Sequence, residues 1–170
     1  MKPGFRLMSL MFKVRDLVSP RAKVLAEAGI EPGQKVLDFG CGPGGYILPL
    51  AKLLGPGGRI YALDEEPRAI EAVRRLAANN GLANVETIQS SGDTGFAGAS
   101  IDVALLYDVF HDLERPDEVL AELCRVLKPG GILSLSDHHM DDGEIRKRVE
   151  EAGLFAFRAR GKKTFTFARD

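Results

Sequence analysis

Short apolar runs alternate with longer amphipathic stretches along most of the chain. Runs bounded by glycine or polar residues predict buried strands, which cover residues 35–39, 59–63, 84–89, 101–107 and 132–136. Apolar residues at helical spacing predict helices, which cover residues 5–18, 20–29, 44–54, 67–80, 116–128 and a last stretch from Asp141 or Asp142, as the cap, to Ala152. Two further runs flank Gly161-Lys162 and predict an antiparallel hairpin over residues 155–160 and 163–168.

This alternation of strands and helices predicts an α/β fold. Strands joined through helices favour right-handed crossovers, and hence a doubly wound, mostly parallel sheet with helices on both faces. In such sheets, ligands bind beyond the carboxyl ends of the strands, where the strand order reverses. We therefore expect the functional residues to follow strands directly.

A glycine-rich loop, residues 40–45, follows the first predicted strand. It matches the pattern G-x-G-x-x-G at Gly40, Gly42 and Gly45, between a strand and a helix as that motif requires. Glycines there permit a tight turn and let the backbone approach a ligand closely. Asp64 ends the next strand, where a carboxylate can accept both hydroxyls of an adenosine ribose. NAD and S-adenosylmethionine both fit these features.

Three further features favour S-adenosylmethionine over NAD. Asp38 places a carboxylate at the end of the first strand, where it would repel a pyrophosphate but help to hold the cationic amino group of a methionine moiety. A second acid, Asp93, follows the third strand and can accept a hydrogen bond from an adenine amino group. The terminal hairpin would add an antiparallel strand to the parallel sheet.

Five motifs, in order and with appropriate spacing, resemble those of the class I S-adenosylmethionine-dependent methyltransferases. They are VLDFGCGPGG at 36–45, ALDEEP at 62–67, GD at 92–93, DVALLYDVFHDL at 102–113 and LKPGG at 127–131. The resemblance extends from about residue 20 to the C-terminus. It implies S-adenosyl-L-methionine as the cofactor and a Rossmann-like sheet of seven strands in the order 3-2-1-4-5-7-6, with strand 7 antiparallel.

The resemblance also implies which residues bind the cofactor: Asp38, Gly40, Cys41, Gly42, Gly44, Gly45, Asp64, Glu65, Asp93, Thr94 and Asp108. The methionine end of the cofactor would lie against the first four of these. Its ribose would bind Asp64, or the acid that follows it, and its adenine would lie near Glu65, Asp93 and Thr94. Asp108, at the end of the fourth strand, would lie below the methyl donor. Cys41 is expected to be a packing residue.

Three histidines are the candidate catalytic residues. An alcohol, phenol or ammonium acceptor needs a general base, whereas a carbanion or thiolate needs none. His111, His138 and His139 all follow strand ends on the expected ligand side. For His111 the alternative is a structural or pocket-lining role. His138 and His139, with the aspartates around them, would contact substrate, hold a metal or form an ordinary loop, and we expect no metal.

The length of 170 residues predicts a single methyltransferase domain over residues 1–170, with a cofactor-binding core at 31–170. Residues 1–30 would form N-terminal helices, and the helix at 5–18 would serve as a lid over the site. Its apolar stripe would alternatively pack on the sheet or form a homodimer contact. Because no further recognition module is expected, we predict a small-molecule acceptor.

The net charge of −1 results from two basic ends and an acidic middle. Nucleic acid is therefore not expected as a partner, and the acidic middle suits a cationic ligand. Two cysteines cannot build a disulfide framework, and no apolar run is long enough for a signal core or a membrane span. We expect a cytoplasmic protein without a membrane partner. The alternatives are an NAD(P)-dependent oxidoreductase and a non-catalytic partner protein that binds RNA through its basic ends.

Overall fold

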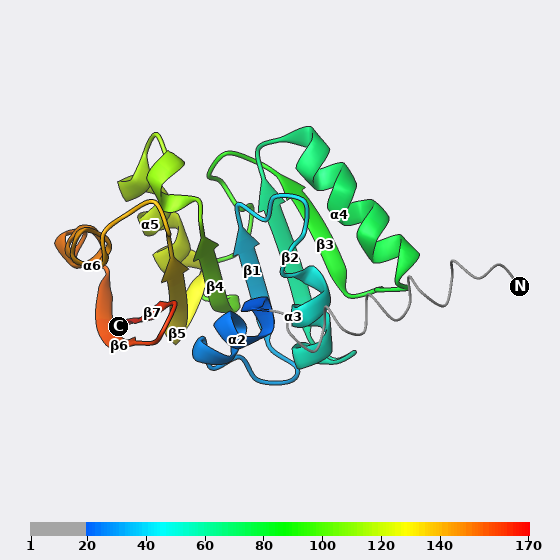
Figure 1. Cartoon of the computed structure of the whole chain (residues 1–170), viewed down its shortest axis with the longest axis horizontal. Coiled ribbons are helices and arrows are strands. Elements are labelled where there is room, and N and C mark those ends of the chain that lie inside the picture. The colour runs from blue at the N-terminus through cyan, green and yellow to red at the C-terminus, as the bar shows by residue number, and fades with distance from the viewer. Residues whose placement is uncertain (1–19) are drawn as a thin grey trace, which may run out of the picture.

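The computed structural model describes residues 20–170. The helix predicted at 5–18, with its role as a lid or dimer contact, lies outside these residues. The described part forms one seven-stranded sheet in the order β3-β2-β1-β4-β5-β7-β6 (Figure 1). β7 runs antiparallel to both β5 and β6, and the other neighbours are parallel. The predicted strand order and the antiparallel seventh strand are confirmed.

The strands agree closely with the apolar runs of the sequence. Their bounds are β1 Lys35–Phe39, β2 Arg59–Asp64, β3 Val85–Gln89, β4 Ile101–Tyr107, β5 Leu127–Ser136, β6 Phe155–Arg160 and β7 Phe165–Arg169. β1 and β4 are almost entirely buried, because they lie at the centre of the sheet with helices on both faces. Residues that follow these two strands are therefore held on rigid supports.

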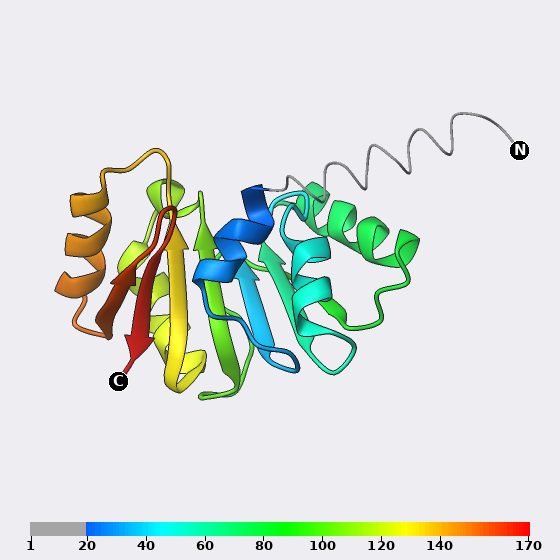
Figure 2. The same cartoon turned by 60° about the horizontal axis from the view of Figure 1, so that its bottom comes forward.

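Helices cover both faces of the sheet. They are α2 Pro20–Glu27, α3 Ile47–Leu54, α4 Pro67–Asn79, α5 Pro116–Val126 and α6 Asp142–Glu151, with a short 3-10 turn, η1, at Phe110–Asp112. Figure 2 shows α2 and α3 in front of the sheet and α5 behind it. Successive strand residues serve opposite faces: Val36 packs in the apolar cluster of α2, α3 and α4, whereas Leu37 packs in that of α5 and α6.

Several predicted element boundaries differ from the structure. β5 begins at Leu127 rather than at Ile132, because Leu127 already pairs with Ile101 before a register shift in the ladder. Residues 129–131, Pro-Gly-Gly, which lie between the helix predicted at 116–128 and the strand predicted at 132–136, are thus part of an irregular strand. α3 begins at Ile47 rather than at Gly44, since a φ of +87° at Gly44 is incompatible with a helix. β7 begins at Phe165 rather than at residue 163.

The position of α6 agrees with the prediction, but the expected capping hydrogen bond is missing. Asp141 occupies the N-cap position, but its side chain makes no capping hydrogen bond. Asp142 is the first helical residue, and its carboxylate instead accepts hydrogen bonds from the guanidinium of Arg160 in β6. Between residues 20 and 170, no helix has the length and apolar character that crossing a membrane requires.

Candidate cofactor and acceptor site

A cavity of about 600 Å³ opens beyond the carboxyl ends of β1, β2 and β3. It is lined by the segments that follow these strands, by the loop after β4 and by one side of α5; the lining includes Gly40, Asp64, Glu65, residues 90–93, Val109, residues 112–115 and Glu122. The strand order reverses here, since β1 lies between β2 and β4. This is the position at which doubly wound sheets bind ligands.

The glycine loop after β1 comes close to the cavity wall at Gly40. The φ of Gly40 is +74°, and a Cβ added there would lie 2.6 Å from a methyl group of Val109, so only glycine fits. Gly42 also has a positive φ, of +51°, but a Cβ there would meet no atom within 4 Å. The backbone at Gly42 therefore borders open space, as a loop that receives a ligand requires.

Asp38, the penultimate residue of β1, carries an unusual carboxyl group. It is only 2% exposed, and its Oδ2 is the one buried side-chain polar atom of residues 20–170 that lacks a hydrogen-bond partner. Burial, and then the nearby charge of Asp64, raise the pKa of Asp38 to about 7. A buried, unpartnered carboxylate is costly, and a cationic group placed against it would relieve that cost.

Asp64 ties the end of β2 to the glycine loop. Its Oδ2 accepts the backbone N–H of Gly42 at 2.8 Å, and its Oδ1 accepts that of Glu66 at 2.9 Å. Each carboxylate oxygen can accept more than one hydrogen bond, so both remain able to accept ribose hydroxyls. Glu65, the adjacent acid, is exposed and also lines the cavity.

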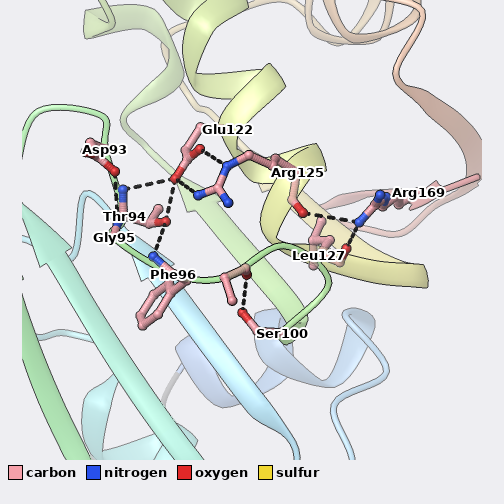
Figure 3. A network of polar contacts seen from close by, with 10 residues as sticks. Asp93, Thr94, Gly95, Phe96, Ser100, Glu122, Arg125, Leu127 and Arg169 are labelled. Carbon is pink, nitrogen blue, oxygen red and sulfur yellow. Dashed lines mark hydrogen bonds and ion pairs between the residues drawn. The ribbon is translucent and has the colours of Figure 1, made fainter.

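The loop after β3 is held from the side of α5. Thr94 is buried, and both its backbone N–H and its hydroxyl donate to Oε1 of Glu122, at 3.1 and 2.5 Å (Figure 3). Asp93, beside it, is exposed and lines the cavity, while its Oδ1 accepts the N–H of Gly95. The loop thus presents one acid to the cavity and uses the next residue as its anchor.

A second group of polar side chains lies at the carboxyl ends of β4 and β5. Asp137 is buried and accepts hydrogen bonds from the backbone N–H groups of His111 and His139. Its Oδ2 lies 2.8 Å from Nδ1 of His111. This hydrogen bond raises the pKa of His111 despite some burial, with smaller contributions from the charges of Asp137, Asp112 and Asp108. The carboxylate of Asp137 thus makes the imidazole of His111 a stronger base than a free histidine.

Asp108 and His138 form a second carboxylate–histidine pair beside Asp137 and His111. Oδ1 of Asp108 lies 2.6 Å from Nδ1 of His138 and also accepts the backbone N–H of that histidine. Asp108 has a φ of +52°, a conformation rare outside glycine, which is found at functional sites more often than elsewhere. The imidazole of His139 lies between the others, with ring centroids 4.3 Å from His111 and 3.8 Å from His138.

Known proteins show the same architecture. A family model described as a methyltransferase domain matches residues 30–162. The chain belongs to the S-adenosylmethionine-dependent methyltransferase family. A methyltransferase structure from Aquifex aeolicus superimposes with a TM-score of 0.78 at 28% identity, over 92% of this chain and 96% of the other. The expected cofactor, S-adenosylmethionine, follows from this membership.

The curated relatives are longer proteins. Nocamycin O-methyltransferase of Saccharothrix syringae is 33% identical over 128 residues, which are 73% of this chain and 41% of the relative. The ubiquinone/menaquinone biosynthesis C-methyltransferase of Pseudomonas putida is 26% identical over 141 residues, 82% of this chain and 55% of the relative. The chain therefore spans about half, or less, of the length of these relatives.

The predicted cofactor residues fall into two groups, those that line the cavity and those that do not. The first group is Gly40, Asp64, Glu65 and Asp93, and the second is Asp38, Cys41, Gly42, Gly44, Gly45, Thr94 and Asp108. A Cβ at Gly44 would crowd the side chains of Ile47, Val73 and Leu76, and a Cβ at Gly45 would meet Arg21. Cys41 is buried in an apolar cluster, and burial raises the pKa of its thiol, which agrees with a packing role.

Sequence reasoning missed Glu122, which both lines the cavity and anchors Thr94. It lies within a helix among other acids, so the sequence offers no signal that separates it from a solvent-exposed glutamate. Sequence reasoning also placed Thr94 beside adenine and Asp108 below the methyl donor. The hydroxyl of Thr94 is bonded to Glu122, and one carboxylate oxygen of Asp108 is bonded to His138. Within residues 20–170, no three His, Cys, Asp or Glu side chains are grouped so as to hold a metal ion.

Proposed function

We propose that this protein transfers a methyl group from S-adenosylmethionine to a small-molecule acceptor. The atom that receives the methyl group is a hydroxyl oxygen of the acceptor. The observation that carries the proposal is Asp38, a buried carboxylate with an unpartnered oxygen beside the open glycine loop. The ammonium of a methionine moiety would neutralise it, whereas a pyrophosphate would add a second negative charge to the same place. Asp38 therefore favours S-adenosylmethionine over a nicotinamide dinucleotide.

The chain has to align the acceptor and remove its proton. The sulfonium of the cofactor supplies an electrophilic methyl group, so alignment is the main requirement, and proximity and orientation contribute roughly 7–11 kcal/mol in favourable cases. A neutral hydroxyl would also need a base, and His138 and His111 each have a carboxylate on Nδ1, the arrangement that orients an imidazole for proton transfer. His139 lies between them and would contact the acceptor.

Small-molecule chemistry is also found among the relatives. The names of the nocamycin and ubiquinone/menaquinone enzymes describe transfer to oxygen and to carbon, respectively. The two carboxylate–histidine pairs favour oxygen, because a carbanion acceptor would need no base at this position. The basic C-terminal end does not favour RNA, since Arg160 is engaged by Asp142 and lies over the ring of Phe165.

Two measurements test this proposal. Calorimetric titration with S-adenosylhomocysteine and with NADH tests the cofactor, and binding of NADH alone would contradict the proposal. A metabolite extract incubated with methyl-labelled S-adenosylmethionine then tests the acceptor, with the labelled products separated by stability to mild acid and base and identified by mass spectrometry. We expect a labelled methyl ether. Labelled carbon–methyl products alone would contradict transfer to oxygen.

A further inference from the structure

Glu122 makes more hydrogen bonds than a typical helical glutamate. Its Oε1 accepts three of them, from the N–H and the hydroxyl of Thr94 and from Nη2 of Arg125. Its Oε2 accepts Nε of Arg125 at 2.7 Å, so the guanidinium binds both oxygens (Figure 3). The hydrogen bond from Arg125 and those from Thr94 outweigh burial and lower the pKa of Glu122 to about 2. The carboxylate is therefore charged and engaged on both oxygens.

The anchored segment is the side of the cavity that follows β3. Residues 90–93 line the cavity, and Thr94 is the next residue along the chain. Oδ1 of Asp93 accepts the N–H of Gly95, which leaves its Oδ2 able to accept a hydrogen bond from a ligand. The hydroxyl of Thr94 accepts the N–H of Phe96, so the same threonine holds the loop on both sides. The direction of the Asp93 carboxylate thus depends on a loop that is fixed at Thr94.

The anchor is itself held rigidly. Val119, Leu120 and Leu123 bury α5 in the apolar core, so the helix does not depend on Glu122 for its position. The guanidinium of Arg125 is held by Glu122. The backbone carbonyl of Arg125 accepts hydrogen bonds from the N–H of Ala99 and from the guanidinium of Arg169. That guanidinium also donates to the carbonyl of Leu127. The contacts of Glu122 therefore connect the loop to a helix and strands that remain in place when Glu122 is changed.

We propose that Glu122 is a positioning residue that holds the loop carrying Asp93. It thereby sets the affinity of the cofactor site and the selectivity of that site for the nucleobase of the ligand. The proposal rests on the proposed function, since it requires an adenosine-bearing ligand in the cavity. An exocyclic amino group on the base donates to the carboxylate of Asp93, whereas a carbonyl at the same position would be repelled by it. Glu122 therefore determines how strongly an adenine is preferred over a hypoxanthine.

The test compares S-adenosylhomocysteine with S-inosylhomocysteine, which carries a carbonyl in place of the amino group. Wild-type protein is expected to bind the adenosyl ligand more tightly in calorimetry. Glutamine at position 122 keeps one acceptor oxygen, but its N–H₂ group faces the backbone N–H of Thr94 or the guanidinium of Arg125, and both of these are donors only. In Glu122→Gln we expect the adenosyl ligand to bind roughly tenfold more weakly and the inosyl ligand to change little.

Glu150→Gln is the matched control. Glu150 also binds the guanidinium of an arginine on its own helix, Arg146, at 2.8 Å, but it lies on α6 and does not line the cavity. Its substitution should leave both affinities unchanged. If Glu122→Gln fails to fold, the pair Thr94→Val and Thr94→Ser takes its place: valine removes the hydroxyl and should lower selectivity, whereas serine retains it and should preserve selectivity.

Each result has a defined meaning. An equal loss of affinity for both ligands would reduce Glu122 to a general structural role and overturn the inference. Unchanged binding of the adenosyl ligand in Glu122→Gln would overturn it as well, while leaving the proposed function standing. Failure of the wild-type protein to bind S-adenosylhomocysteine would instead contradict the proposed function, and with it the inference that depends on it.

Discussion

The two halves of the site treat their carboxylates in opposite ways. In the cofactor half, Asp38 is buried at the end of β1 with an oxygen that has no partner. In the histidine half, Asp137 is also buried, but its carboxylate is hydrogen-bonded to two backbone N–H groups and an imidazole. One half is incomplete until a cation arrives, and the other is assembled in advance. Ligand-free stability and ligand affinity should therefore respond differently to changes in the two halves.

The largest effect is expected from Asp38→Asn. Because burial raises the pKa of Asp38 to about 7, the ionised form costs the free protein up to about 4 kcal/mol of unfolding free energy at pH 8. Asparagine removes that cost, so urea unfolding at pH 8 should show a more stable protein. The same change should weaken binding of S-adenosylhomocysteine by roughly 10- to 150-fold, because the ammonium loses a charged acceptor.

The internal control for Asp38→Asn is pH. At pH 5 the wild-type carboxyl is protonated in the folded state, so the stability gain from asparagine should be much smaller there. A variant that is less stable than wild type at pH 8 would mean that Asp38 is not an unsatisfied charge. The contrast between the two halves of the site would then disappear.

A second, smaller effect concerns the pH dependence of cofactor binding. Binding of an ammonium requires the ionised form of Asp38, and the pKa of this group in the free protein is raised to about 7. Affinity for S-adenosylhomocysteine should therefore level off about one pH unit above this pKa and fall by about tenfold per pH unit well below it. Calorimetry at pH 6 in buffers of different ionisation enthalpy should detect nearly one proton released per ligand bound, and Asp38→Asn should release none.

How far the sequence could predict this site depends on how local each signal is. Asp38 and Asp64 were predicted because each ends an apolar run, and strand ends meet at one edge of a parallel sheet. Glu122 was not predicted, because its partner Thr94 lies 28 residues earlier and the helix periodicity marks only its apolar face. The bond of Asp108 to His138, 30 residues later, has no local signal either.

Contacts between residues far apart in the sequence also limited the prediction of one strand boundary. Apolar runs and the five motifs predicted the seven strands and, through the family resemblance, their order, which the structure confirms. The start of β5 was wrong because Pro129, Gly130 and Gly131 favour a turn in isolation. Pairing of Leu127 with Ile101 keeps this segment in the sheet, and a Cβ at Gly131 would lie 2.8 Å from the carbonyl oxygen of Lys128. Such tertiary pairing overrides local propensity.

The smallest effect, in the histidine half, is expected from Asp137→Asn. Asparagine retains one acceptor oxygen but loses the charge that binds His111, so unfolding free energy at pH 5.5 should fall by about 1–3 kcal/mol. The raised pKa of His111 contributes stability that is present at low pH and is lost as pH rises through that pKa. The lowered pKa of Asp137, where hydrogen bonds outweigh burial, contributes stability above pH 4 that is lost at lower pH.

The stability difference between Asp137→Asn and wild type should therefore be greatest from about pH 4 to 6.5 and smaller at pH 8.5, as measured by urea unfolding. Asp141→Asn is the matched control, because the exposed side chain of Asp141 makes no capping hydrogen bond. This substitution should leave the unfolding free energy close to that of wild type. Affinity for S-adenosylhomocysteine should stay close to wild type in both variants. If Asp137→Asn instead weakened that affinity as much as Asp38→Asn does, the histidine half would not be assembled independently of the cofactor.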